Sequence, residues 1–468
     1  MKVISLKNTL IQLREILSIS SLRKFLQCLV LITFCMSSYA IEIVDSEIDD
    51  TIKKLVSPIL KAAGTDPNEI KFYILLDDSI NAFVHGGRNI FISTALISSF
   101  NDPDILKGVI AHELGHIEGG HLVRRDEKIR QIQKQSMIAM GLLGAAAALS
   151  GNTDAIIGGA LGQSHLFSRD YLAYSRSQEV SADQAAVRFL HSSKNSVIGI
   201  VKINEYFAKK QKQEYKDLNP YATTHPLSES RLSSMNLALK DEPSSYKSSA
   251  AERKQYSRAV AKLRGFLNKS QVNDVIGTPL DDFSQKYQEA ISLYEKHNTK
   301  AAITVLDKLI NQEPNNGYLY ELKGQILFRS GDVIGSANSY KQAIEYINNP
   351  ITKAEYAVSL ANAVDTYKTK SEREKVLQNI IQLLEEVLAS DLKSPYIYRI
   401  LATAYGKLGD LGYTNLMLAE EALMQNKYDD AKKFARLAEK HSQNRARLKL
   451  KIDDIMKEIR NITDNIQN

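Results

Sequence analysis

Residues 111–117 read AHELGHI, a stretch that contains the pattern His-Glu-x-x-His. Residues four apart on a helix lie on one face, so His112 and His116 can direct imidazole nitrogens at one metal ion. Glu113 lies beside them, where its carboxylate can take a proton from water that attacks a peptide carbonyl. The pattern predicts a metal-dependent peptidase centre on a helix. The alternative is a chance match on a surface helix, so the prediction needs further ligands.

Strand and helix patterns alternate around this motif. Helical periodicity over residues 46–63 is followed by β-rich stretches over 70–76 and 89–94. The motif helix is predicted to begin near Asp102 and to break at Gly119-Gly120. We therefore expect a mainly α fold with a small β-hairpin or sheet in front of the motif helix.

A metal site of this kind needs a third protein ligand, and the sequence offers two candidates. His121 comes close to the metzincin pattern, but Leu122 stands where that pattern has its last histidine. His121 is therefore expected near the site or on the surface. The helix predicted over 171–190 carries Glu179 and Asp183 four apart on one face. Glu179 can be the third ligand, and Asp183 can orient a ligand histidine; two solvated acids are the alternative.

The first 40 residues have the pattern of a secretory signal peptide. Arg23 and Lys24 precede an apolar run over 25–36, and small residues end it at positions 38 and 40. An uncleaved membrane anchor is the alternative, but this run is shorter than the roughly 20 residues a span requires. We predict export and cleavage after Ala40.

Composition narrows the classes of function. The chain has 468 residues, 44% hydrophobic and 24% charged, as in soluble globular proteins of two or three domains. Both cysteines, Cys28 and Cys35, lie in the predicted signal peptide. Loss of that peptide, with five basic residues and one acid, lowers the formal net charge from +6 to +2. This balance does not favour nucleic-acid binding.

A different period begins near residue 282. Small residues recur 34 positions after small ones, and a bulky residue recurs 34 positions after a bulky one. This spacing is the tetratricopeptide period. The three clearest pairs are Ala290 and Gly324, Ala302 and Ser336, and Leu306 and Tyr340. We expect about four helix pairs in an α-solenoid whose concave face can hold another protein; an array with a purely structural role is the alternative.

These patterns divide the chain into three parts. The predicted boundaries are a signal peptide over 1–40, a catalytic domain over 41–270 and repeats over 271–468. A Gly/Ala-rich stretch over 137–162 is too short in its apolar arm to span a bilayer. It is expected to form a packed or mobile helical hairpin near the site, with a membrane-touching lid as the alternative.

Four elements in order resemble the family of CAAX prenyl endopeptidases and HtpX-type heat-shock proteases, which are gluzincin zinc proteases. They are the motif over 112–116, the Glu179 and Asp183 pair, the hairpin over 81–94, and Thr224-His225-Pro226 followed by Arg231. Nearly all of the mature chain resembles the exported branch of this family, which carries tetratricopeptide repeats. The resemblance implies a gluzincin-type metalloprotease domain followed by an α-solenoid.

The resemblance also implies roles for individual residues. One zinc ion per chain would bind His112, His116 and Glu179, with Glu113 as the general base. The segment Ile90, Phe91, Ile92 and Ser93 would be an edge strand that pairs with the substrate main chain, a mode that suits extended peptides. His225 would be a fourth ligand in a closed state, although a plain turn before a helix also explains His225-Pro226. Arg231 would lie near the bound peptide or the transition-state oxyanion.

The export signal, the motifs and the repeats together predict a periplasmic zinc metalloendopeptidase. The resemblance implies misfolded or stalled outer-membrane β-barrel proteins as its substrates, with repeats that dock unfolded substrates or the β-barrel assembly machinery. A chaperone or assembly scaffold with a self-inhibited protease site is the alternative. Peripheral membrane contact through 137–162 is a further, weaker hypothesis.

Overall fold

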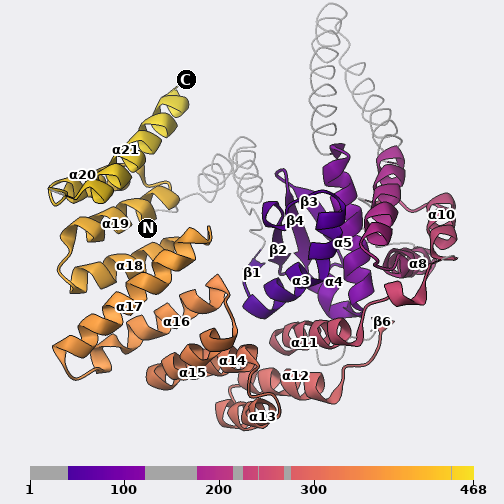
Figure 1. The fold of residues 1–468 in the computed structure, drawn as a ribbon, viewed down its shortest axis with the longest axis horizontal. Helices are drawn as coiled ribbons and strands as arrows, with labels where there is room; N and C mark the ends of the chain where they lie inside the picture. The colour runs from indigo at the N-terminus through magenta and orange to yellow at the C-terminus, as the bar shows by residue number, and fades with distance from the viewer. Residues whose placement is uncertain are drawn as a thin grey trace, which may run out of the picture. The chain divides into compact units, whose positions relative to one another are not determined.

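The computed structural model describes residues 41–121, 176–213, 225–240, 242–267, 276–443 and 445–467 (Figure 1). From Ile43 onward, the described part of the chain belongs to one compact unit. The predicted signal peptide and the Gly/Ala-rich stretch over 137–162 lie outside the described residues. Within the described ranges, no helix combines the length and hydropathy that a membrane span needs.

A small sheet lies in front of the motif helix, as predicted. Its strands are β1 (Glu42–Ile43), β2 (Lys71–Leu75), β3 (Ala82–His85) and β4 (Asn89–Ser93). Their order is β1-β2-β4-β3, with β2 parallel and β3 antiparallel to β4. Strands β3 and β4 form the expected hairpin. The short strands β5 (Phe100–Asn101) and β6 (Ile276–Gly277) form a second, parallel pair.

The prediction that Ile90 to Ser93 form an edge strand is wrong. Strand β4 lies inside the sheet, because Phe72 of β2 and Val84 of β3 both pair with Ile90. Alternation of apolar residues reports which face of a strand is buried, and it does not report whether the strand has one neighbour or two. The edge beside β4 is β3.

Helices surround this sheet and enclose the first core. They are α3 (Ser46–Ala62), α4 (Thr94–Ser99), α5 (Pro103–Glu118), the helical residues 176–192, α8 (Ile198–Gln213), α10 (Glu229–Lys240) and α11 (Ala250–Phe266), with 3-10 turns η1 (Pro67–Glu69) and η2 (Ser244–Tyr246). Helix α5 begins as predicted, because the Asp102 side chain caps it and Pro103 fills its first turn. It ends at Gly119. Most of α5 is buried, so the motif lies inside the domain.

The rest of the chain is an array of helices. Its five successive pairs are α12 (Asp282–Glu295) with α13 (Thr299–Gln312), α14 (Gly317–Arg329) with α15 (Val333–Tyr346), α16 (Pro350–Ala363) with α17 (Lys370–Ala389), α18 (Pro395–Lys407) with α19 (Leu411–Met424), and α20 (Tyr428–Glu439) with α21 (Ala446–Gln467); the 3-10 turn η3 (Val364–Thr366) follows α16. The described residues thus contain one pair more than the predicted four. The extra pair is α16 and α17, where the 34-residue spacing is lost: Lys370 and Glu374 stand 34 positions after Ser336 and Tyr340.

Three hydrophobic cores follow one another along the chain. The first joins the sheet to the helices from α3 to α11. The second lies over α11 to α14, and the third lies over α15 to α21. Helix α11 contributes Val260 to the first core and Ala261 to the second. The predicted fold class, mainly α with a small sheet, is confirmed, whereas the boundary at residue 270 stays a prediction.

Candidate metal centre

Helix α5 places the three residues of the motif inside the catalytic domain. His112 and Glu113 are 2% and 1% exposed, and His116 lies one turn further along the same face. The Nε2 atoms of His112 and His116 are 3.1 Å apart. The spacing of the motif therefore brings two imidazole nitrogens to one point.

A glycine inside the motif allows the next helix to approach α5. A Cβ atom on Gly115 would lie 2.7 Å from the carbonyl oxygen of Ala182, which is closer than atoms pack. The backbone of the 176–192 helix therefore lies directly against α5, and Glu179 reaches both histidines. Its carboxylate oxygens lie 3.2 Å from His112 Nε2 and 3.2 Å from His116 Nε2. Glu179 is buried, at 1% exposed.

His225 reaches the same point from the segment before α10. Its Nδ1 atom is 3.2 Å from His112 Nε2 and 3.1 Å from a Glu179 oxygen. The side chain is 7% exposed. The structure thus brings the predicted fourth group to the three predicted ligands.

These four groups fit a metal ion. One ligand atom from each of His112, His116, Glu179 and His225 lies within 4.8 Å of the other three. Ligands held at about 2.0–2.1 Å around tetrahedral zinc lie roughly 3.3–3.4 Å apart, close to the 3.1 and 3.2 Å separations given above. The buried Glu113 Oε1 accepts no hydrogen bond from the residues that the structure describes and lies 3.4 Å from His225 Nε2. Glu113 is thus beside the ligands and is not one of them.

Asp183 and Arg231 hold the outer side of His112. The Nδ1 atom of His112 lies 3.0 Å from an Asp183 oxygen. Arg231 donates to both oxygens of Asp183, over 2.6 and 2.9 Å, and its Nη2 lies 3.1 Å from Glu179. The predicted role of Asp183 matches this geometry. Arg231 is engaged with these two carboxylates, so its predicted role beside the substrate stays a prediction.

His121 holds the outer side of His116. The Nδ1 atoms of the two rings are 3.0 Å apart, and the rings meet edge to face with centroids 5.0 Å apart. His121 is 6% exposed. The sequence placed His121 near the site or on the surface; it lies at the site, outside the four-ligand group.

Burial and charge together set the protonation of these groups. Burial lowers the pKa of His112, but the carboxylates of Glu179 and Asp183 outweigh burial and raise it to about 10. Burial lowers the pKa of His116 to about 3. Glu179 and Asp183 therefore stabilise positive charge at this position. The same negative charge would attract a metal cation.

Sequence reasoning found the ligand candidates and missed three features that position them. Gly115 stands at a variable position of the motif, although a glycine inside a buried helix signals close backbone contact. The contact between Arg231 and Asp183 joins residues far apart in the sequence, and no local pattern reports it. The partner of His121 was missed for a different reason, because it depends on how the chain turns after α5.

Comparisons with known proteins agree with this geometry. Residues 44–238 match the model of Peptidase family M48. A beta-barrel assembly-enhancing protease of Yersinia pestis is 24% identical over 331 residues, covering 69% of this chain and 66% of that protein. The protein of that name from Escherichia coli (strain K12) is 24% identical over 323 residues, covering 67% of this chain and 64% of the relative. The matched part thus spans less than two thirds of each relative.

Among solved structures, a thermophilic TPR protein of Thermus thermophilus matches 37% of this chain and 98% of its own, with 12% identity and a TM-score of 0.25.

The segment that matches the family model includes His112, Glu113, His116, Glu179 and His225. The resemblance to a family of zinc proteases, predicted from the motifs, is therefore confirmed, and residues 44–238 carry the sequence pattern of Peptidase family M48.

Proposed function

We propose that this chain is a zinc-dependent metalloendopeptidase. The observation that carries the proposal is the buried convergence of His112, His116 and Glu179 beside the carboxylate of Glu113. His112, His116 and Glu179 would hold the zinc ion, which would supply Lewis-acid polarisation of a peptide carbonyl. Glu113 then takes a proton from the attacking water and gives it to the leaving amine. Burial raises the pKa of Glu113, which suits a group that must both take and release a proton.

Glu113→Gln tests this chemistry. The variant should bind zinc as tightly as the parent chain, because Glu113 is not a ligand, and it should fail to cleave an unfolded test protein. Glu113→Asp, which keeps a carboxylate on a shorter side chain, is the matched control and should retain part of the activity. Normal cleavage by Glu113→Gln would refute the assignment.

We infer that substrate pairs with strand β3, the edge of the sheet beside β4. Helix α5 packs against β3, and a backbone hydrogen bond from Val84 reaches Glu113. An extended peptide added to this edge would place its carbonyl groups next to the general base, and main-chain pairing would accept many sequences. Val84→Pro removes the N–H that bonds Glu113 and distorts this edge strand, so it should lower cleavage of an unfolded substrate more than it lowers zinc affinity.

We propose that His225 holds the centre in a closed state. Its Nδ1 atom takes the fourth position of the ligand group, where the attacking water must enter. His225→Ala should then raise proteolysis of an unfolded test protein several-fold. An unchanged, negligible rate with zinc bound would favour the alternative function, a chaperone or assembly scaffold.

The name of the relatives, beta-barrel assembly-enhancing protease, supports a role in β-barrel assembly. We propose misassembled outer-membrane β-barrel proteins as the substrate class and the periplasm as the location. The predicted signal peptide is consistent with this location. Cleavage of an assembly-stalled β-barrel protein in cells, compared with its folded form, tests the substrate class. Co-sedimentation with lipid vesicles tests the weaker hypothesis of membrane contact.

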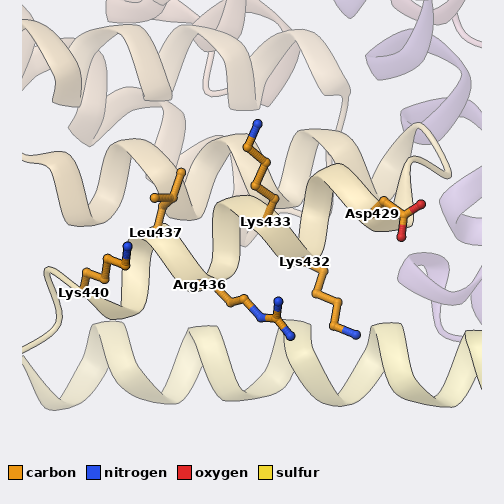
Figure 2. A pocket seen from close by; sticks show the side chains of 6 residues that line it. All are labelled: Asp429, Lys432, Lys433, Arg436, Leu437 and Lys440. Atoms are coloured by element: carbon orange, nitrogen blue, oxygen red, sulfur yellow. The ribbon is translucent and has the colours of Figure 1, made fainter.

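The helical array would dock such substrates, and α20 offers one surface for this purpose. Four exposed cations, Lys432, Lys433, Arg436 and Lys440, line a hollow along α20 together with Asp429 and Leu437 (Figure 2). We call them the α20 basic face. In the part of the chain that the structure describes, none of these four cations forms an ion pair. An acidic stretch of an unfolded chain would neutralise them, and Leu437 would contact an apolar neighbour of that stretch.

Charge reversal tests this surface. The variant Lys432→Glu/Arg436→Glu/Lys440→Glu should weaken binding of an acidic unfolded polypeptide to the Glu113→Gln chain. The matched control is Lys341→Glu/Lys375→Glu/Lys457→Glu, which makes the same change of charge at exposed lysines on three other helices. Equal loss of binding in both variants would mean that net charge alone attracts the polypeptide.

A further inference from the structure

We propose that His121 is a positioning residue for the ligand His116, and that Gly119 is required for this role. The proposal rests on the proposed zinc site. His121 follows the two histidines of the motif and stands one residue before the last histidine position of the metzincin pattern. It does not belong to the four-ligand group. Its contact with His116 indicates its role.

The two ring nitrogens of His116 face opposite environments. Its Nε2 atom points at the ligand group, 3.1 Å from His112 Nε2 and 3.2 Å from Glu179. Its Nδ1 atom lies 3.0 Å from His121 Nδ1. A neutral imidazole that offers Nε2 to a metal carries its proton on Nδ1, so His116 donates and His121 accepts. One hydrogen bond therefore fixes the tautomer and the orientation of both rings.

The chain reaches this arrangement through two glycines after α5. Gly120 has a φ of 61°, a conformation that turns the chain back toward the helix. A Cβ atom on Gly119 would lie 2.4 Å from His121 Nε2 and 2.7 Å from its Cε1. The His121 ring therefore occupies the space that any other side chain at 119 would need. Gln178 donates to the His121 carbonyl oxygen over 3.1 Å, which joins this turn to the helix that carries Glu179.

The two ligand histidines are thus held by different chemistry. His112 donates to the carboxylate of Asp183, whose charge Arg231 balances. His116 donates to a second imidazole, which adds no negative charge beside the buried carboxylates of Glu113 and Glu179. A neutral acceptor at this position orients the ring without adding to their repulsion.

Zinc affinity of the full chain, measured by competition with a chelator, tests the role of His121. His121→Phe keeps an aromatic ring and removes the acceptor, so it should weaken zinc binding about 10- to 100-fold. His121→Asn places an amide oxygen near the position of Nδ1 and should remain within a few-fold of the parent. His441→Phe, at an exposed histidine outside the catalytic domain, is the control and should bind zinc like the parent.

Gly119→Ala tests the route by which His121 is placed. It should weaken zinc binding as much as His121→Phe, and the double variant should be no weaker than either, because both remove the same contact. Thermal melting of the zinc-free variants shows whether each still folds.

Two results would overturn the inference: zinc affinity of folded His121→Phe within about twofold of the parent, or equal loss in His121→Asn and His121→Phe. A parent chain that binds no zinc would instead refute the proposed function, and this inference with it.

Discussion

Among the residues that the structure describes, two clusters of charged side chains satisfy their carboxylates in different ways. In the first, the metal centre, Glu179 faces three imidazole rings. In the second, Lys262 of α11 lies among Asp45, Glu47 and Glu321, with its Nζ 2.8, 3.4 and 3.9 Å from their oxygens. We call this the Lys262 cluster.

The difference between the clusters is the source of positive charge. The Lys262 cluster contains its own cation, which is 2% exposed, so it is complete when the chain folds. The metal centre offers lone pairs of imidazole and carboxylate, which are the atoms that coordinate a metal. In the metal centre, Arg231 pairs with Asp183 and lies 3.1 Å from Glu179, and a metal ion bound at the ligand atoms would add the remaining positive charge. The metal centre is therefore suited to bind a metal ion, and the Lys262 cluster stabilises the fold.

The Lys262 cluster also joins parts of the chain that are far apart in sequence. Asp45 and Glu47 lie at the start of α3, and Glu321 lies in α14. Tyr287 of α12 donates to Glu47 over 2.8 Å, and Thr352 of α16 donates to Glu321 over 2.8 Å. The cluster thus ties α3 and α11 to the first helices of the array.

Glu179→Gln is expected to have the largest effect, because it removes a ligand from the first cluster. The amide oxygen is a weaker ligand than a carboxylate, so the variant should lose zinc and lose activity by roughly 10³-fold or more, about 4 kcal/mol. Metal analysis of the purified chain, together with cleavage of an unfolded protein, measures both effects. Glu242→Gln, at a buried acid that pairs with His191 outside the centre, is the control. Full zinc content in Glu179→Gln would remove Glu179 from the ligand set.

Lys262→Met should have the next largest effect, because it removes the cation from the second cluster. The buried Glu47 and Glu321 and the partly buried Asp45 would lose the cation that they share, which typically costs about 3–5 kcal/mol. Urea unfolding measures the free energy of unfolding. Lys286→Met, at a partly exposed lysine paired with Asp282, is the control and should cost at most about 1 kcal/mol.

Partial rescue sharpens this prediction. Lys262→Met/Glu321→Gln removes one of the stranded charges and should recover part of the lost stability. If Lys262→Met unfolds at the same urea concentration as the parent, the Lys262 cluster does not stabilise the contact of α3 and α11 with the first helices of the array.

Asp183→Asn should have a smaller effect on the metal centre, because Asp183 acts through His112. Loss of an outer acceptor of this kind typically weakens metal binding 10- to 100-fold, about 1.4–2.7 kcal/mol. The variant also leaves Arg231 without its bidentate partner. Arg231→Lys, which keeps the charge and loses the fork of donors, should weaken zinc binding less than Asp183→Asn. Chelator competition measures both, and a greater loss in Arg231→Lys would mean that Arg231 acts on Glu179 directly.

Local patterns in the sequence were sufficient for most of the metal centre. The Asp102 cap set the start of α5, and the four-residue spacing of Glu179 and Asp183 placed both on the face that meets the motif. What the sequence did not indicate depends on contacts between distant segments. The interior position of β4 depends on its parallel pairing with β2. The pair α16 and α17 departs from the 34-residue spacing, because α17 has 20 residues where α13 and α15 have 14. The partners of Lys262 come from segments far away in the chain, so no spacing links them.

The smallest expected effect is a difference in pH dependence that comes from the Lys262 cluster. Burial raises the pKa of Glu321 from 4.5 to about 7, although Lys262 opposes this. Burial, followed by the charge of Glu321, also raises the pKa of Glu355 to about 8. A raised carboxyl pKa means that the folded chain binds protons that the unfolded chain has lost. The stability from these groups is present in full below pH 4.5 and is lost as pH rises through 7 and 8.

Glu321→Gln should reduce this dependence, because a glutamine does not titrate. Between about pH 5 and pH 8 the free energy of unfolding of the zinc-free parent should fall more than that of the variant, with a difference on the order of 1–2 kcal/mol. Glu289→Gln, at an acid of α12 outside the cluster, is the control and should follow the parent. Urea unfolding at four pH values measures the slopes. Parallel slopes for the parent and Glu321→Gln would mean that Glu321 stays ionised beside Lys262, and the second cluster would then hold its full negative charge at neutral pH.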